Sequence, residues 1–182
     1  MRALMLLFSC LALFAGSIQA DQTDSRLNNL FARLQVGADL STIRMTENQI
    51  WEIWLQHPNA DVERLMDLGT QHMNQRQFPE ALLIFSQITE RYPNYAEGWN
   101  KRATLYYLLG DLDASLADIE KTLTLEPRHF GALSGQGLVY IQRKELQKAK
   151  QAFEALVKIH PNSPNARENL ETVTESLRFD II

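Results

Sequence analysis

The stretch AEGWNKRATLYYLLGDLDASLADIEKTLTLEPRH, residues 96–129, sets the architecture of the chain. Leu109-Gly110-Asp111 places glycine where a helix ends, because glycine readily adopts the positive φ that this position favours. Pro127 ends the segment that follows, since proline cannot continue a helix and restricts the residue before it. These residues are therefore expected to form two helices joined by a tight turn.

The same pattern recurs before and after this stretch, with a period of 34 residues and no gap. In rows that start at Val62, Ala96 and Phe130, small residues align at the eighth and twentieth positions: Gly69, Ala103 and Gly137, then Ala81, Ser115 and Ala149. Bulky residues align at the fourth and twenty-fourth positions, namely Leu65, Trp99 and Leu133, then Phe85, Ile119 and Phe153. Proline occupies the thirty-second position as Pro93, Pro127 and Pro161. A sustained period of this length indicates an array of helical hairpins.

These columns resemble the consensus of the tetratricopeptide-repeat (TPR) family over residues 62–163. The resemblance implies an all-α fold in which three repeats form a right-handed superhelix. The repeats are at residues 62–95, 96–129 and 130–163. The small residues are expected where the two helices of a repeat approach most closely. The bulky residues at the fourth and twenty-fourth positions are expected to fill the seams between repeats.

The segments that flank the repeats are expected to cover the ends of the array. Residues 21–61 are predicted to form a degenerate first repeat, a helical hairpin with helices near residues 24–36 and 47–56. Its Trp51 and Trp54 are interpreted as core aromatics, with stacking on a ligand as the alternative. Residues 164–182 are expected to form a capping helix, because Ser163-Pro164 is a favourable helix start, followed by a tail. The apolar residues Phe179, Ile181 and Ile182 are expected to pack back on the array or to bind a partner.

The first 20 residues have the pattern of a secretory signal peptide. Arg2 precedes an apolar run from Ala3 to Gly16, and Ala20 precedes the acidic Asp21. Cleavage after Ala20 would leave no integral membrane span and no cysteine, because Cys10 is the single cysteine of the chain. Export without disulfides predicts a periplasmic location. A retained N-terminal anchor is the alternative.

Composition and motifs give no indication of catalysis. The chain is 45% hydrophobic and 22% charged, which is typical of an ordered domain. Its net charge is −4 and no run of Lys or Arg exceeds two residues, so no nucleic-acid partner is expected. The four histidines, His57, His72, His129 and His160, do not have the spacing of metal ligands, and no nucleotide-binding or nucleophile motif is present. We therefore expect no enzyme, no cofactor and no metal, and interpret Asp111 and Asp113 as helix caps rather than calcium ligands.

The resemblance implies that a partner binds on the concave face, which is formed by the first helix of each repeat. Four columns point there, and they hold Glu63, Met66, Thr70 and Met73, then Glu97, Asn100, Thr104 and Tyr107, then Gly131, Ser134, Leu138 and Ile141. The predicted contact set is Met66, Thr70, Met73, Glu97, Asn100, Lys101, Thr104, Tyr107, Ser134 and Leu138. Methionines, hydroxyls, an amide and a tyrosine suit an extended or helical peptide. The alternative is that some of these residues contact the N-terminal helices.

Two further patterns bear on the partner. TPR adaptors that bind the acidic tails of chaperones carry Lys or Arg and Asn across three repeats, whereas here only Asn100 and Lys101 can take part, so no such clamp is expected. Gly98 and Gly131 lower helix propensity, and with Asn100, Arg102, Arg128 and His129 they form a candidate patch, although packing between repeats explains them equally well. The stretches at residues 96–104 and 125–133 resemble exported proteobacterial repeat proteins of undefined role.

The sequence therefore favours a periplasmic scaffold that binds a partner polypeptide through its concave groove. The alternative is a holdase-like maturation factor that binds exported unfolded polypeptides, as the repeat domains of cytochrome c biogenesis do. An enzyme is a distant third hypothesis.

Overall fold

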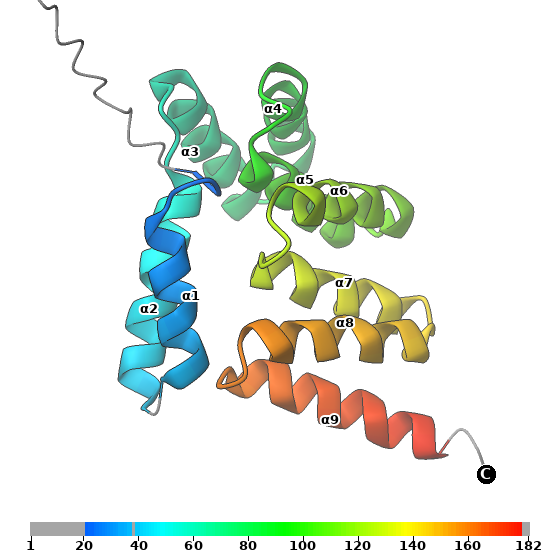
Figure 1. Cartoon of the computed structure of the whole chain (residues 1–182). Helices are drawn as coiled ribbons and strands as arrows, with labels where there is room; N and C mark the ends of the chain where they lie inside the picture. Colours follow the sequence, from blue (N-terminus) through cyan, green and yellow to red (C-terminus); the bar gives the residue numbers. More distant parts are fainter. Residues whose placement is uncertain (1–20, 38, 180–182) are drawn as a thin grey trace, which may run out of the picture.

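A computed structural model describes residues 21–37 and 39–179, and the regular secondary structure of this part of the chain is entirely helical (Figure 1). Its helices are α1 (Arg26–Val36), α2 (Leu40–Leu55), α3 (Ala60–Asn74), α4 (Phe78–Arg91), α5 (Ala96–Leu109), α6 (Leu112–Leu125), α7 (Phe130–Gln142), α8 (Leu146–Ile159) and α9 (Pro164–Phe179). The predicted signal peptide, residues 1–20, and the tail residues Ile181 and Ile182 lie outside the described residues.

The repeats form three helical pairs, α3 with α4, α5 with α6, and α7 with α8, and the pairs stack in chain order (Figure 1). The predicted close approach within each pair is confirmed, because Ala81, Ser115 and Ala149 are at most 1% exposed. A Cβ atom on Gly69 would lie 2.6 Å from the Phe85 ring, which leaves room only for glycine. The small columns therefore set the distance between paired helices.

The turn inside each repeat requires a left-handed residue. Gly110 has φ 81° in the second repeat, and Arg76 and Lys144 adopt φ 60° at the equivalent places in the other two. Asp111 accepts a hydrogen bond from the Ala114 N–H at 3.1 Å, as expected of a helix cap.

The N-terminal hairpin, α1 and α2, does not continue the stack as a degenerate first repeat would. It lies along one edge of the array, where α1 contacts α8 and α2 contacts α5 (Figure 1). One hydrophobic cluster joins Leu27 and Trp54 of the hairpin with Phe130 and Phe153 of the third repeat. The hairpin therefore closes the edge of the array instead of its end.

The second helix of the hairpin begins earlier than predicted, at Leu40 instead of near residue 47. Asp39 caps it, because its Oδ1 accepts hydrogen bonds from the Ser41 hydroxyl at 2.6 Å and from the Thr42 N–H at 2.8 Å. These bonds lower the pKa of Asp39 to about 2, the Ser41 hydroxyl having the largest effect. Asp39 was not among the predicted helix caps.

The hairpin is tied to all three loops that follow a repeat proline. The Tyr95 hydroxyl donates to the Trp54 carbonyl at 2.9 Å in the first loop. In the second loop the Arg128 guanidinium donates to Asn28 Oδ1 at 2.9 Å, and in the third the Asn162 amide donates to the Leu34 carbonyl at 3.3 Å. The hairpin therefore fixes the three repeats relative to one another.

Helix α9 caps the other end by burying Ala166 and Val173. Phe179 is 74% exposed, so this side chain does not pack back on the array. Among the described residues, no helix has both the length and the apolar character needed to cross a membrane.

Candidate functional site

A pocket of about 350 Å³ opens between α5 and α7, over α6. It is lined by Asn100, Ala103, Thr104, Tyr107 and Leu108 of α5, by Ser115 and Ile119 of α6, and by Gly131, Ala132, Ser134, Gly135 and Leu138 of α7. Five of the predicted contact residues therefore meet in one place: Asn100, Thr104, Tyr107, Ser134 and Leu138. We call this pocket the α5–α7 groove.

The groove is open because α7 presents small residues to α5. Gly131, Ser134 and Gly135 face it, and a Cβ atom on Gly135 would still lie 3.6 Å from Ile119 Cδ1, an ordinary contact. The exposed Leu108 and Leu138 lie among its lining residues. The surface is thus mainly apolar, with the hydroxyl groups of Ser134 and Tyr107 able to donate or accept hydrogen bonds. The Thr104 hydroxyl donates to the Asn100 carbonyl at 3.0 Å and can still accept a bond.

The predicted contact residues on α3 lie outside this groove. Met66 is 2% exposed and packs in a cluster with Val62, Tyr95 and Leu105, so it cannot serve as a contact surface. Thr70 and Met73 are half-buried on the same helix and do not line the groove. The expectation that the groove spans all three repeats is therefore wrong for Met66, because the seam there is filled.

Glu97 and Lys101, which were predicted to contact a partner, form contacts within the protein instead. Glu97 is 1% exposed, and its Oε2 lies 3.0 Å from His129 Nε2 and accepts from Asn100 Nδ2 at 3.0 Å. Lys101 Nζ lies 3.4 Å from the other carboxylate oxygen, Oε1. Both side chains are thus engaged inside the protein. Glu97 in particular cannot contact a partner.

The hydrogen bonds of His129 define its tautomer. Its Nδ1 accepts from the Ala132 N–H at 3.0 Å and so caps α7, which leaves the proton on Nε2 to be donated to Glu97. The Trp54 ring of the hairpin stacks on the imidazole with centroids 4.1 Å apart and planes inclined by 10°. The hairpin therefore supports the residue that holds Glu97.

The candidate patch around Gly98 and Gly131 is a packing feature. A Cβ atom on Gly98 would lie 2.7 Å from Ile88, and one on Gly131 would lie 2.7 Å from the Trp51 ring. Arg102 is bound to Asp118 at 2.7 and 2.9 Å, and Arg128 to Glu126 at 2.9 Å. Contact with the N-terminal helices, the alternative for the concave face, is thus found at Gly131.

The family profile of the tetratricopeptide repeat matches residues 66–125 and 102–164. The chain belongs to the TPR family. A TPR repeat-containing protein of Rhizobium etli is 33% identical over 152 residues, which are 84% of this chain and 74% of that protein.

Solved TPR structures show the same fold. The first TPR of Spaghetti (RPAP3), bound to the HSP90 peptide SRMEEVD, superposes with a TM-score of 0.61 at 21% identity, over 63% of this chain and 90% of that one. The Yersinia enterocolitica type III secretion chaperone SycD, in complex with a peptide of the translocator YopD, has a TM-score of 0.61 at 12% identity, over 65% of this chain and 95% of that one.

The loop positions after each repeat proline carry a sequence signal for the packing of the hairpin. The two positions after each repeat proline hold Asn94 and Tyr95, Arg128 and His129, and Asn162 and Ser163. Of these, the side chains of Tyr95, Arg128, His129 and Asn162 contact the N-terminal hairpin, and the Asn94 carbonyl accepts from Gln22, which precedes α1. Large polar or aromatic side chains at these turn positions could have indicated an element packed along this edge.

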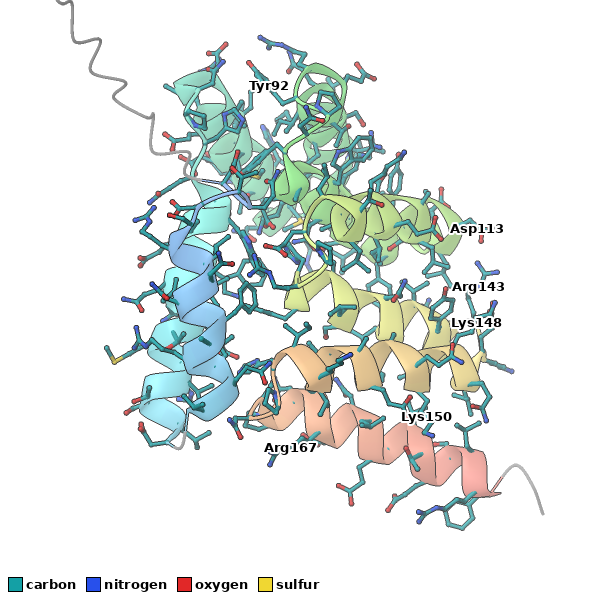
Figure 2. The ribbon with its side chains drawn as sticks, in the orientation of Figure 1. Tyr92, Asp113, Arg143, Lys148, Lys150 and Arg167 are labelled. Carbon is teal, nitrogen blue, oxygen red and sulfur yellow. The ribbon has the colours of Figure 1, made fainter. Side chains whose placement is uncertain are left out.

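The opposite edge of the TPR array carries exposed charges. Asp113, Arg143 and Lys148 lie there, away from the hairpin (Figure 2). Arg143 pairs with Asp113 and Glu145, and Lys148 pairs with Glu145. Within the described residues, no group of three or more His, Cys, Asp or Glu side chains could hold a metal ion.

Proposed function

We propose that this TPR protein is a periplasmic scaffold that binds a segment of a partner polypeptide in the α5–α7 groove. The observation that carries the proposal is the groove itself, an open pocket of about 350 Å³ between α5 and α7. Its volume lies in the range of roughly 300–1,000 Å³ that is usual for ligand sites.

The lining of the groove suits an uncharged peptide segment. Leu108, Leu138 and Tyr107 offer apolar contact to a side chain, while Thr104 and Ser134 offer hydroxyls to a peptide backbone. Peptide complexes of Spaghetti and of SycD, whose TPR folds are similar, support the binding of a peptide segment as such.

An acidic tail is a poor candidate for the partner. Lys101 is paired with Glu97 and Arg102 with Asp118, and neither cation lines the groove. A carboxylate entering the groove would therefore lose its hydration without gaining an ion pair.

The periplasmic location rests on the predicted signal peptide. Asp21 and Gln22, the first two residues after the predicted cleavage site, are buried. The Gln22 amide donates to the Asn94 carbonyl at 2.6 Å and accepts from the Ala96 N–H at 3.3 Å. N-terminal sequencing of protein from a periplasmic fraction should start at Asp21, and Met1 retained in a membrane fraction would contradict the proposal.

Partner capture from periplasmic extract tests the binding function. Tyr107→Ala should weaken binding of the captured polypeptide by about 1–3 kcal/mol, as loss of an aromatic interface residue does, without changing the helical circular-dichroism signal. Lys150 of α8 lies outside the groove (Figure 2), so Lys150→Ala is the control and should bind like wild type. Equal binding by both variants would overturn the groove as the site.

A holdase-like maturation factor is the second candidate. Exposed Leu108, Leu109 and Leu138, which are 53%, 47% and 36% accessible, favour contact with unfolded chains. A scaffold should capture one partner stoichiometrically, whereas a holdase should capture several unfolded polypeptides and suppress their aggregation.

A further inference from the structure

Asn100 joins the groove to the buried interior. It lines the groove but is only 7% exposed, and its Nδ2 donates to Glu97 Oε2 at 3.0 Å. An ionised carboxylate only accepts hydrogen bonds, so the amide nitrogen, and not the oxygen, must face Glu97. Among the described residues, the Asn100 Oδ1 has no hydrogen-bond partner, which leaves it available to an occupant of the groove.

Glu97 is itself held in place from two further sides. His129 Nε2 donates to the same Oε2 atom at 3.0 Å, and Lys101 Nζ lies 3.4 Å from Oε1. His129 cannot turn away without losing its second bond, in which Nδ1 accepts from the Ala132 N–H. The carboxylate therefore has one orientation, and Asn100 takes its orientation from it.

The N-terminal hairpin completes this arrangement. Trp54 stacks on the His129 imidazole at 4.1 Å, and the Trp54 carbonyl accepts from the Tyr95 hydroxyl at 2.9 Å. Trp51 meets the same imidazole edge-on at 5.5 Å and abuts Gly131, which lines the groove. The N-terminal hairpin, which lies outside the repeats, is thus connected to the groove. The connection runs through Trp54, His129, Glu97 and Asn100.

We propose that Glu97 and His129 are positioning residues that fix the Asn100 amide with Oδ1 as a hydrogen-bond acceptor, so that the groove selects a peptide segment by an N–H donor. This inference rests on the proposed function and specifies its partner as an uncharged segment with an apolar side chain. The N–H bonds to Asn100 Oδ1, and the side chain contacts Tyr107 and Leu138. A carboxylate at the same place has no proton to donate and cannot bond to Asn100 Oδ1.

Two small neutral probes that differ in their N–H groups test the proposal. N-acetyl-leucinamide offers amide N–H groups, whereas its methylated analogue, N-acetyl-N-methyl-leucine dimethylamide, is also uncharged but has no N–H group to donate. Each is titrated into the purified protein while the amide signals of groove residues are followed by NMR, with dissociation constants expected on the order of millimolar for ligands this small. We expect N-acetyl-leucinamide to bind about three- to tenfold more tightly, the worth of one net hydrogen bond.

Two substitutions at Glu97 distinguish the positioning of the Asn100 amide from an effect of the Glu97 charge. Glu97→Met keeps the length of the side chain but removes the acceptor, so the preference for N-acetyl-leucinamide should fall below about twofold. Glu97→Gln removes the charge but keeps one oxygen, which can accept from both His129 and Asn100 as Oε2 does, so the preference should be retained. Loss of the preference in Glu97→Gln, or its survival in Glu97→Met, would overturn the proposal.

Hydrogen exchange of the Asn100 side chain in the wild-type protein provides a test that does not depend on how the variants fold. The side-chain NH₂ protons of Asn100 should exchange with water at least about tenfold more slowly than those of exposed Asn48, because Nδ2 donates to a buried carboxylate. Equal exchange rates would overturn the positioning role.

Equal binding of both probes in the groove would also overturn the positioning role while leaving the proposed function intact. The absence of shifts in groove residues with either probe would refute the groove as a binding site.

Discussion

The seam between α3 and α5 and the seam between α5 and α7 are built from the same repeat but differ in what occupies them. At the fifth repeat position, the first seam has Met66, which is 2% exposed in a cluster with Tyr95 and Leu105. The second seam has Ser134 at the same position, followed by Gly135, and a pocket of about 350 Å³ remains open there. The size of one or two side chains thus decides whether a seam belongs to the core or forms a groove.

This difference explains why a binding surface can be confined to part of a regular array. The repeat fixes which positions point to the concave face, but each repeat supplies its own side chains to those positions. Substitutions that empty the filled seam or fill the open seam therefore test this difference most directly.

The largest effect is expected where the filled seam is emptied. Met66→Ser removes a buried apolar side chain and leaves a cavity, which should lower the free energy of unfolding by about 3–5 kcal/mol. Met45 is 61% exposed on α2, so Met45→Ser should cost less than about 0.5 kcal/mol. Urea denaturation of both variants checks this, and similar losses would mean that the first seam is not packed as described.

Two glycines of α7 provide the next test. A Cβ atom on Gly137 would collide with the Phe153 ring, so Gly137→Ala should cost about 1–3 kcal/mol. Gly135 faces the open groove with 3.6 Å to its nearest neighbour, and Gly135→Ala should stabilise by up to about 1 kcal/mol because alanine favours a helix. The two melting temperatures should move in opposite directions, and a shift in the same direction would show that the second seam is not open at Gly135.

Closing the open seam should affect binding more than stability. Ser134→Met places in the groove the residue that fills the first seam, and it should reduce binding of N-acetyl-leucinamide about tenfold or more by occupying its volume. Gln87→Met, at an exposed position of α4, is the control and should bind like wild type. NMR titration gives both values, and unchanged binding by Ser134→Met would place the site elsewhere.

The smallest expected effect concerns the hairpin that borders the second seam. His160 lies 3.3 Å from Glu47 of α2, and burial lowers the pKa of His160 below its ordinary value of 6.5. The unfolded chain therefore binds the proton more readily, and stability should fall as the pH decreases below about 6.5, by about 1 kcal/mol at pH 5.5. Burial raises the pKa of Glu47, which acts in the opposite direction and is common to wild type and variant.

Denaturation of wild type and His160→Asn at pH 7.5 and 5.5 isolates this contribution. The variant should lose less stability than wild type over this interval, since it lacks the group that gains a proton on unfolding. An equal loss in both proteins would exclude His160 as the cause.

The sequence predicted the repeats well because their signals are local and periodic. Ala81, Ser115 and Ala149 recur every 34 residues and all lie where paired helices meet. The position of the N-terminal hairpin could not be predicted in this way. Its contacts, such as that between Tyr95 and Trp54, join residues far apart in the chain, and an apolar helical face does not specify which surface it covers.

The candidate site could likewise be predicted only where its signals are local and periodic. Asn100, Tyr107 and Leu138, which the column positions assign to the concave face, line the groove, and their contact with a partner stays a prediction. The column positions assign Met66 and Glu97 to this face as well, because the direction of a side chain does not tell whether a neighbour covers it. Burial of Glu97 depends on His129, whose position follows from the hairpin.

Site-specific photo-crosslinking in cells that express the protein tests most directly whether the α5–α7 groove holds a partner polypeptide. A photoreactive phenylalanine analogue replaces Leu138 in the groove or, as the control, Lys150 of α8 outside it. The groove position should give a discrete crosslinked product that Ser134→Met removes, whereas the control position should give none. Equal products at both positions, or no product from the groove position, would contradict the account.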